Sequence, residues 1–326
     1  MSTRTLPARA ETVVLFAHAA YRLGDALKAR NAGLKYLEAR SPDEVLARIS
    51  EANIVSVSMM WRNEWLAQAP KLAFVQSISA GMNQYDVAAF RTAGVRLASA
   101  QGVNAQAVAE HAIALTLSIT RQLHMARDHQ HKKLWRGMIG DPAKREDELA
   151  GKTMLIVGMG GIGGKLARIA KAFDMHVIGT RRDPAKGTVG ADEVFADNDL
   201  LKVLPRADIV VLTCPITPQT TNLINAAAFA AMKPGAMLIN VARGAVVDEP
   251  ALITALQSGR LASAGIDVTV EDPLSESSPL WTMPNVVITP HTGGETRAYE
   301  ENVIDVLLDN LARLERGETA LRNEFA

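Results

Sequence analysis

The chain is poor in cysteine and carries no net charge. Its 326 residues include one cysteine, Cys214, which excludes an internal disulfide and is typical of proteins in a reducing cytoplasm. The 35 basic residues balance 35 acidic ones, so no long-range field attracts nucleic acid or an anionic membrane surface. These two shortages predict a cytoplasmic protein whose partners include neither nucleic acid nor membrane.

Long uninterrupted apolar runs are also missing. The N-terminal stretch MSTRTLPARAETVVLFAHAA lacks the basic start and continuous apolar core of a secretory signal. The most apolar longer segment, 108–123, contains Glu110, His111 and Arg121 and is too short to cross a bilayer. We expect this segment to form a buried helix.

Shorter apolar runs alternate with helical stretches in the N-terminal part of the chain. Such runs begin at Val13, Ile54 and Leu72, and a helical stretch over 24–32 separates the first two. Buried apolar strands separated by helices are typical of a parallel sheet covered on both faces. At about 150 residues per domain, the chain has room for two such domains.

The same alternation returns in the second half. A long helix over 104–123 and a polar arm over 124–149 precede it, and a last helix over 299–314 follows it. The predicted strands are 153–157, 176–180, 209–213, 237–241, 264–268 and 286–289. The sequence therefore predicts an α/β fold with two doubly wound, Rossmann-like parallel-sheet domains and an interdomain cleft. We expect the first domain to comprise 1–103 plus 293–326, and the second to comprise 104–292.

A glycine-rich turn follows the predicted strand 153–157. Residues 158–163, GMGGIG, fit the pattern G-x-G-x-x-G and open a helix. In this context Gly158 allows the tight turn, Gly160 lets a pyrophosphate approach the backbone, and Gly163 lets helix and strand pack closely. A tight turn without a ligand is the structural alternative, but the strand–turn–helix setting favours a dinucleotide. We expect the cofactor to contact Gly158, Gly160, Gly161, Ile162 and Gly163.

The end of the next predicted strand bears on the choice between NAD and NADP. An NAD site usually has a carboxylate there that accepts hydrogen bonds from the ribose. This chain has Thr180, Arg181 and Arg182, with Asp183 one position too late. Two guanidinium groups would pair with a 2′-phosphate, so NADP is preferred and NAD remains possible. The alternative is that both arginines are solvated surface residues.

Chemistry-bearing side chains follow three further predicted strands. Arg243 comes just after 237–241, Asp267 with Glu271 and Asp272 ends or follows 264–268, and His291 follows 286–289. Parallel strands bring their carboxyl ends to one edge, where open α/β sheets bind ligands. A guanidinium and an imidazole at this edge are what hydride addition to a ketone requires, because negative charge develops on the carbonyl oxygen.

Several segments carry a family resemblance. The second half contains, in this order, VGMGGIGGKLA, TCPITPQTTNLIN, MKPGAMLINVARGAVVDE and PNVVITPHTGG, and the first half contains QSISAGMNQYD and GVNAQAVAEHAIALTL. This set resembles the D-isomer-specific 2-hydroxyacid dehydrogenases, the family of D-glycerate and glyoxylate/hydroxypyruvate reductases. The resemblance covers nearly the whole chain.

The resemblance implies catalytic roles for three residues. Arg243 is similar to the arginine that binds the carboxylate and carbonyl oxygen of a 2-oxo acid, and His291 to the acid/base that protonates that oxygen. The family normally has Glu at the position of Asp272, so Asp272 is the expected partner of His291, with Glu271 as the alternative. A carboxylate beside the imidazole fixes its tautomer and favours its protonated form.

The resemblance also implies the substrate and cofactor contacts. Ser79, Ala80 and Gly81 match the loop whose amides hold the substrate carboxylate, and Trp61 either lines the substrate pocket or packs in the core. Asp267 matches the residue that orients the nicotinamide carboxamide. The remaining expected cofactor contacts are Cys214, Pro215, Val241, Ala242 and Gly293.

The predicted activity is hydride transfer from NAD(P)H to a small 2-oxo acid of the glyoxylate/hydroxypyruvate type. The resemblance also implies a homodimer, with the arm over 124–149 contributing. No metal is expected, because the spacing of His124, His129 and His131 does not match a helical zinc site. The alternative function is that of an NAD(P)(H)-sensing regulatory binding protein of the same fold.

Overall fold

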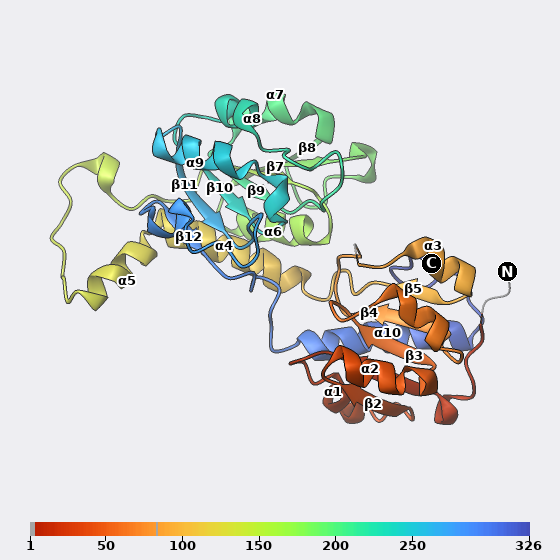
Figure 1. Cartoon of the computed structure of the whole chain (residues 1–326). Helices are drawn as coiled ribbons and strands as arrows, with labels where there is room; N and C mark the ends of the chain where they lie inside the picture. The colour runs from red at the N-terminus through yellow and green to blue at the C-terminus, as the bar shows by residue number, and fades with distance from the viewer. Residues whose placement is uncertain (1–3, 83) are drawn as a thin grey trace. The chain divides into compact units, whose positions relative to one another are not determined.

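The computed structural model describes residues 4–82 and 84–326 of the chain. The chain forms two compact units (Figure 1). Unit 1 comprises Met1–Asn104 and Thr296–Ala326, and unit 2 comprises Ala105–Glu295. Each unit has its own sheet and its own core, and each is described in turn.

Unit 1 is built on a five-stranded parallel sheet in the order β2-β1-β3-β4-β5. Its strands are β1 (Val13–Ala17), β2 (Lys35–Ala39), β3 (Ile54–Val57), β4 (Phe74–Ser77) and β5 (Arg96–Ala98). Its helices are α1 (Leu23–Ala29), α2 (Pro42–Arg48), α3 (Val87–Ala93) and α10 (Tyr299–Glu315).

Both faces of this sheet are covered. Alternate residues of a strand point to opposite faces, so Val14 and Phe16 pack with α1 and α10, whereas Leu15 and Ala17 pack in the core beneath α2 and α3. Strands β3 and β4 are buried at every position. A parallel sheet with helices on both sides accounts for these continuous apolar runs.

Unit 2 is built on a seven-stranded sheet in the order β12-β11-β10-β9-β6-β7-β8, in which every pair is parallel. Its strands are β6 (Thr153–Val157), β7 (His176–Arg181), β8 (Glu193–Ala196), β9 (Ile209–Leu212), β10 (Ala236–Asn240), β11 (Leu261–Ile266) and β12 (Val286–Ile288). Its helices are α4 (Ala105–Thr120), α5 (Leu123–His131), α6 (Gly161–Ala172), α7 (Leu200–Val203), α8 (Ala226–Ala231) and α9 (Glu249–Gln257).

The core of unit 2 also has two layers. Met154 and Ile156 of β6 pack on the side of α4 and α6, and Leu155 and Val157 pack on the side of α7, α8 and α9. All carboxyl ends of the seven strands lie at one edge because the sheet is parallel throughout. That edge is where the sequence places its candidate site residues.

The predicted α/β class with two doubly wound parallel sheets is confirmed. Three strands were not predicted: β2, β5 and β8. All three lie at sheet edges. β2 and β8 have partly exposed residues, and β5 has only three residues and is covered by the C-terminal segment, so none has the longer apolar run from which the other strands were predicted. The helix expected over 104–123 ends at Thr120, because Gln122 adopts a left-handed backbone with φ 50°. A second helix, α5, then begins at Leu123 and extends into the predicted arm.

Within residues 4–82 and 84–326, the structure contains no helix that is both long enough and apolar enough to span a membrane.

Candidate active site

The glycine turn between β6 and α6 has three positions with distinct steric demands. Gly158 has φ 106°, and a Cβ there would lie 2.7 Å from the backbone nitrogen of Cys214. A Cβ on Gly163 would overlap the carbonyl oxygen of Gly158 and lie 3.2 Å from the Ile156 side chain. A Cβ on Gly160, by contrast, would have no heavy atom within 4 Å. Gly158 and Gly163 therefore allow close packing, while Gly160 leaves the surface of the turn open.

The turn presents the amino end of α6 at this open surface. The N–H groups of Gly158 and Met159 donate to the carbonyl oxygen of Thr180 at 3.1 and 2.8 Å, which holds the turn against β7. Gly160 precedes the helix and has no side chain to cap it, so the first helical amides lack an acceptor within the helix. Unpaired amides at a helix start, beside a surface left free of side chains, fit the diphosphate of a dinucleotide.

The polar side chains at the end of β7 differ in burial and in hydrogen bonding. The Thr180 side chain is fully buried, and its hydroxyl has no hydrogen-bond partner within 4–82 and 84–326. Thr180 contributes to the turn through its carbonyl oxygen. Arg181 donates to the carbonyl oxygen of Gly187 at 2.9 Å, and Asp183 accepts a bond from a backbone amide two residues later. Arg182 is exposed and makes no side-chain bond with any residue in 4–82 or 84–326. Of the two predicted arginines, Arg182 alone has its guanidinium uncommitted among these residues.

The segments after β9 and β10 place buried apolar side chains at the same edge of the sheet. Cys214 is 8% exposed, and burial raises the pKa of its thiol to about 11. A thiol that stays protonated is a poor nucleophile, so Cys214 is suited to packing and not to covalent catalysis. Val241 and Ala242 are also buried, and the Ala242 amide donates to the Asn240 side chain at 3.0 Å. Pro215 continues the segment after Cys214.

Arg243 comes immediately after the buried residues Val241 and Ala242. Its side chain is exposed, and its one described hydrogen bond runs from Nη1 to the carbonyl oxygen of Ala242 at 2.6 Å. The next residue, Gly244, has no room for a Cβ, because the backbone carbonyl of Thr269 occupies that space. The loops after β10 and β11 are therefore in direct contact, and Arg243 keeps most of its donors free.

Asp267, at the end of β11, organises the segment that follows β12. Its carboxylate is 4% exposed and accepts bonds from the amides of Thr292 and Gly293, both at 3.0 Å, and from the hydroxyl of Thr289 at 2.7 Å. His111 of α4 approaches the same carboxylate at 3.3 Å. Burial alone would raise the pKa of Asp267, but these hydrogen bonds outweigh it and hold the pKa below its ordinary value.

His291 lies in that segment and pairs with Asp272. Its Nδ1 is 2.6 Å from Asp272 Oδ2, and the two side chains are 47% and 50% exposed. An ionised carboxylate can only accept, so Nδ1–H donates and Nε2 is left for a ligand. The carboxylate of Glu271 makes no described bond, although its backbone carbonyl accepts one from Thr269. The structure thus pairs His291 with Asp272 and not with Glu271.

The strand order brings these groups to one edge of unit 2. His291 follows β12, Asp267 and Asp272 follow β11, and Arg243 follows β10, its neighbour. Neighbouring strands are about 4.8 Å apart, so Arg243 and His291 follow strands separated by about 10 Å. Cys214, the glycine turn and Arg182 follow β9, β6 and β7 in turn. One edge therefore carries the glycine turn near its centre, and the His291–Asp272 pair with Arg243 towards one end.

In unit 1 the predicted substrate loop follows β4. The Ser79 amide donates to the Ser77 hydroxyl at 3.1 Å, and the Ser79 hydroxyl is also bonded to that of Ser58. The amides of Ala80 and Gly81 have no described acceptor. Of the three amides expected to hold a carboxylate, two are therefore free within the described residues.

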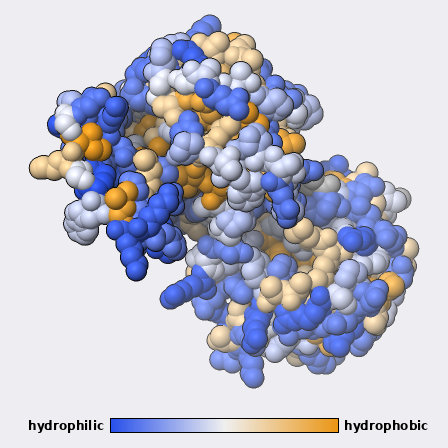
Figure 2. Space-filling view, turned by 60° about the vertical axis from the view of Figure 1, so that its left-hand side comes forward, coloured by the Kyte–Doolittle hydropathy of each residue, from blue (hydrophilic) through white to orange (hydrophobic). Residues whose placement is uncertain are grey.

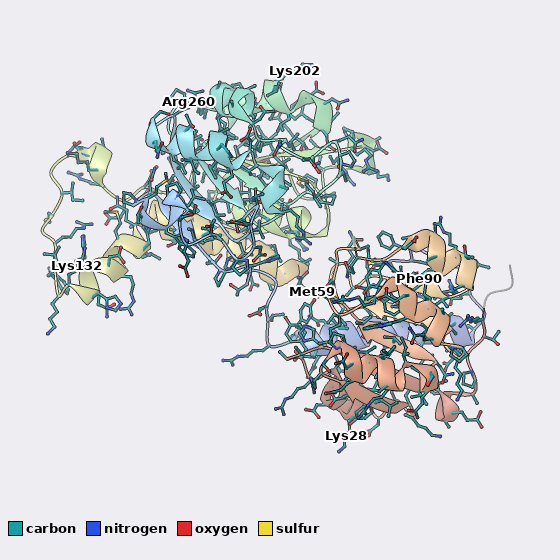
Figure 3. All side chains as sticks on the ribbon, in the orientation of Figure 1. Lys28, Met59, Phe90, Lys132, Lys202 and Arg260 are labelled. Atoms are coloured by element: carbon teal, nitrogen blue, oxygen red, sulfur yellow. The ribbon has the colours of Figure 1, made fainter. Side chains whose placement is uncertain are left out.

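Trp61 packs in the core of unit 1. It is 2% exposed, and its ring contacts those of Trp65, Tyr85 and Phe90, the last of which is labelled in Figure 3. Met59, labelled in the same view, is 85% exposed by comparison. This geometry favours the packing interpretation of Trp61 over a place in a substrate pocket.

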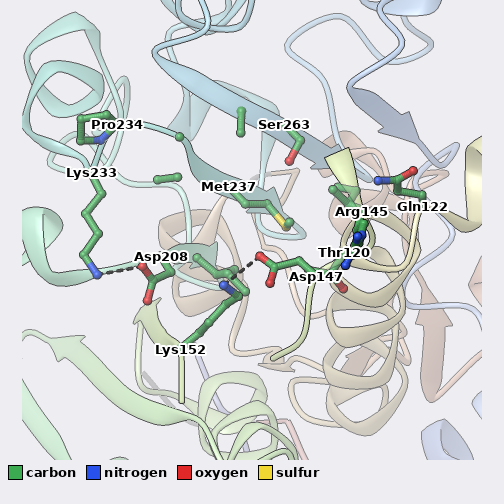
Figure 4. A pocket seen from close by; sticks show the side chains of 15 residues that line it. Thr120, Gln122, Arg145, Asp147, Lys152, Asp208, Lys233, Pro234, Met237 and Ser263 are labelled. Atoms are coloured by element: carbon green, nitrogen blue, oxygen red, sulfur yellow. Dashed lines mark hydrogen bonds and ion pairs between the residues drawn. The ribbon is translucent and has the colours of Figure 1, made fainter. Parts of the chain in front are cut away.

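A separate cavity of about 240 Å³ lies at the opposite edge of the unit 2 sheet (Figure 4). Its lining includes two ion pairs, Lys152 with Asp147 and Lys233 with Asp208, both at 2.8 Å. These charges are already paired within the chain, so a ligand would have to break an ion pair to bind them. Over the described ranges, no three His, Cys, Asp or Glu side chains are grouped as metal ligands.

Two residues that contact the site were not predicted, His111 and Thr289. His111 Nε2 lies 2.8 Å from Thr289 Oγ1, which in turn donates to Asp267. The available signals were an ionisable residue inside an apolar helix and a hydroxyl two positions before His291. Neither feature predicts that α4 passes beside the end of β12, because that arrangement depends on how the whole unit folds.

The chain matches the family model described as "D-isomer specific 2-hydroxyacid dehydrogenase, NAD binding domain" over residues 113–293. It is 39% identical over 248 residues to glyoxylate/hydroxypyruvate reductase B of Citrobacter koseri, covering 76% of each chain. It is 35% identical over 283 residues to D-3-phosphoglycerate dehydrogenase of Mycobacterium leprae, covering 86% of this chain and 51% of that one. The chain therefore spans about half the length of this second relative.

Solved structures agree with these matches. A protein from Thermus thermophilus is 33% identical, with a TM-score of 0.82 over 97% of this chain and 100% of that one. A D-isomer specific 2-hydroxyacid dehydrogenase from Xanthobacter autotrophicus Py2, solved with NADPH and MES, is 28% identical, with a TM-score of 0.79 over 96% and 98%. The similarity thus extends over both units.

Proposed function

The chain belongs to the D-isomer-specific 2-hydroxyacid dehydrogenases, and from that premise we propose that it transfers a hydride between NAD(P)H and a small 2-oxo acid, giving the D-2-hydroxy acid. The observation that carries the proposal is the 2.6 Å bond between His291 and Asp272, at the same sheet edge as the glycine turn and Arg243. The substrates we propose are glyoxylate and hydroxypyruvate, after the relative from Citrobacter koseri.

The chemistry assigns each side chain a task. When bound, a nicotinamide cofactor supplies the hydride. Arg243 binds the substrate carboxylate and meets the negative charge that develops on the carbonyl oxygen. His291, in its protonated form, gives the Nε2 proton to that oxygen, and Asp272 holds the ring in the required orientation through Nδ1. In the reverse direction His291 Nε2 accepts the hydroxyl proton.

The substrate and domain assignments form part of the same proposal. The amides of Ala80 and Gly81 are free to bind a carboxylate, which supports the role proposed for the loop that begins at Ser79. We assign the substrate (lid) role to the domain 1–103 plus 293–326 and the dinucleotide role to 104–292. Gly293 and Asp267 remain proposed contacts of the nicotinamide end.

We propose NADP as the preferred cofactor, with NAD as the alternative. The support is the uncommitted guanidinium of Arg182 at the end of β7, where a 2′-phosphate would need a cation. The adjacent carboxylate in the sequence, that of Asp183, accepts a hydrogen bond from the Ala185 amide in its own turn. The related structure from Xanthobacter autotrophicus Py2 was solved with NADPH.

We also propose that the protein is a cytoplasmic homodimer that forms through its dinucleotide-binding domain, with the arm over 124–149 contributing. In the arm over 124–149, Trp135 is 97% and Met138 is 94% exposed. Figure 2 shows hydrophobic residues scattered among hydrophilic ones on the face that it presents. Large exposed apolar side chains on a protruding segment are typical of an interface. Sedimentation of the wild type and of a Trp135→Ser, Met138→Ser double variant tests this: a dimer that becomes a monomer supports it, and a wild-type monomer contradicts it.

The deciding experiment follows the oxidation of NADPH, and then of NADH, with a panel of 2-oxo acids. The panel contains glyoxylate, hydroxypyruvate and 3-phosphohydroxypyruvate, the last because a relative is named for D-3-phosphoglycerate. We expect turnover of glyoxylate or hydroxypyruvate, a D-configured product where the product is chiral, and loss of turnover in His291→Ala. Cofactor binding without turnover of any panel member would instead favour the NAD(P)(H)-sensing binding protein.

A further inference from the structure

The ring of His111 reaches from α4 to the segment that carries His291. Most side chains on the buried side of α4 are apolar, among them Val108, Ala112 and Leu115. His111, by contrast, has polar partners outside the helix: its Nε2 lies 2.8 Å from Thr289 Oγ1 and 3.3 Å from Asp267 Oδ1. A polar ring that is largely buried is expected to be hydrogen-bonded, and both polar partners of this ring lie beyond α4.

The direction of the hydrogen bonds follows from the acceptor at their end. Asp267 is ionised and can only accept, so the Thr289 hydroxyl donates to it at 2.7 Å. The same oxygen of Thr289 then accepts from His111, which means that Nε2 of His111 carries a proton. The result is a directed chain of donors from α4, through the end of β12, to the carboxylate at the end of β11.

The carboxylate at the end of this chain holds the turn around His291. Its two oxygens accept the amides of Thr292 and Gly293, and the His291 amide donates to the backbone carbonyl of Asp267 at 2.9 Å. His291 itself has φ 57°, a left-handed backbone that costs a non-glycine residue about 1 kcal/mol or more. These bonds account for its persistence there.

Gly293 shows how tightly the parts fit. A Cβ at this position would lie 2.7 Å from Asp267 Oδ2 and 3.1 Å from the ring of His111. The glycine therefore lets its amide and the imidazole approach the same carboxylate. The ring of His111 packs directly against the turn that contains His291.

We propose that His111 and Thr289 are positioning residues that hold the backbone of His291 so that its ring meets Asp272. This inference rests on the proposed function for its kinetic consequence, since His291 is the proposed acid. Neither His111 nor Thr289 needs to touch the reacting atoms, because each acts through Asp267 and the turn.

The kinetic test uses pairs of variants that remove or retain a donor. Thr289→Val and His111→Leu remove the donors, whereas Thr289→Ser and His111→Gln retain one. The donor-free variants are expected to lower kcat about 10- to 100-fold, while KM for the 2-oxo acid changes about twofold or less. The donor-retaining variants are expected to recover most of kcat.

A matched control addresses the loss of a buried hydroxyl as such. Thr116 is also buried on α4, but its hydroxyl donates to the carbonyl of Ala112 in the same helix, at 2.8 Å. Thr116→Val therefore removes the same atom without touching the turn, and its kcat is expected to stay within about twofold of wild type. An equal fall of kcat in Thr116→Val and Thr289→Val would overturn the proposal.

A spectroscopic readout separates this inference from the proposed function. Nitrogen NMR of histidine-labelled full-length protein reports which ring nitrogen carries a proton, and His291→Gln identifies the signal of His291. Thr289→Val is expected to weaken the Nδ1–H signature of His291, and Thr289→Ser to preserve it. An unchanged His291 spectrum in Thr289→Val overturns the positioning role, whether or not any 2-oxo acid is turned over.

Discussion

Replacing Asp272 by Asn removes the negative charge from the partner of His291 while keeping the size and an oxygen acceptor of the side chain. The wild-type bond is a charge-assisted one at 2.6 Å between Nδ1 and Oδ2. The protonated ring that acts as the acid gains most from this charge, because the neutral ring has no net charge to stabilise. We therefore expect Asp272→Asn to slow the proton transfer more than it weakens substrate binding.

The size of the effect follows from the exposure of the pair. Hydrogen bonds to charged groups contribute about 1.5–3 kcal/mol, and the lower part of this range applies where water screens the charges. The two side chains are 47% and 50% exposed, so we expect a loss of about 1.5–2 kcal/mol. At about 1.4 kcal/mol per factor of ten, kcat falls about 10- to 30-fold.

Glu271→Gln is the matched control, since it removes the same charge from the adjacent residue. Its carboxylate makes no described bond, so a screened surface charge is lost and kcat is expected to change about twofold or less. Steady-state oxidation of NADPH at saturating 2-oxo acid measures both variants. Equal losses, or a larger loss in Glu271→Gln, would show that the bond seen in the structure does not govern the acid step.

Three further predictions concern the cofactor edge and the buried carboxylate. Arg182→Ala is expected to raise Kd for NADPH at least about tenfold more than Kd for NADH. Arg181→Ala is expected to change mainly the loop after β7, because the Arg181 guanidinium is bonded to the backbone there. Fluorescence titration measures both Kd values, and equal effects of Arg182→Ala on the two cofactors argue against an NADP site. Gly158→Ala is expected to lower the free energy of unfolding by about 2 kcal/mol or more, because Gly158 has φ 106° and no space for a Cβ. Gly160→Ala is expected to fold normally but to bind NADPH weakly. Urea unfolding measures the first effect and cofactor titration the second. The folded-state pKa of Asp267 is lowered, so its charge stabilises the fold above about pH 4 and this contribution is lost as the pH falls through that pKa. The Tm difference between wild type and Asp267→Asn is thus largest near neutral pH and shrinks in acid, and a difference that grows in acid contradicts the assignment.

The central strands of both sheets were predictable because burial on both faces requires a continuous apolar run. Strands β6 and β9 lie within a residue of their expected bounds for this reason. The edge strand β2, with the sequence KYLEA, has two exposed and two half-buried positions, so its composition does not differ from that of a loop. The end of α4 was predicted at the wrong residue for a different reason. The left-handed backbone that follows the helix is at Gln122, whereas a glycine at that position would have indicated the helix end.

Candidate site residues were predictable where a motif sits between a strand and a helix or directly after a strand. The glycine turn and the positions of Arg243 and His291 are of this kind, and their roles stay predictions until the variants are measured. The partner of His291 was left open between Asp272 and Glu271, because one residue of register in the loop after β11 reverses which side chain faces the ring. Geometry in the folded loop selects Asp272.

What the amino-acid sequence determined by itself is local: which runs are apolar enough to be buried, and which turn is too rich in glycine to carry side chains. Tertiary structure alone decided which distant groups share a hydrogen bond. His111 and Thr289 are 178 residues apart, and they meet because α4 packs across the ends of β11 and β12. Such contacts depend on the packing of helix against sheet, and no stretch of sequence encodes that distance on its own.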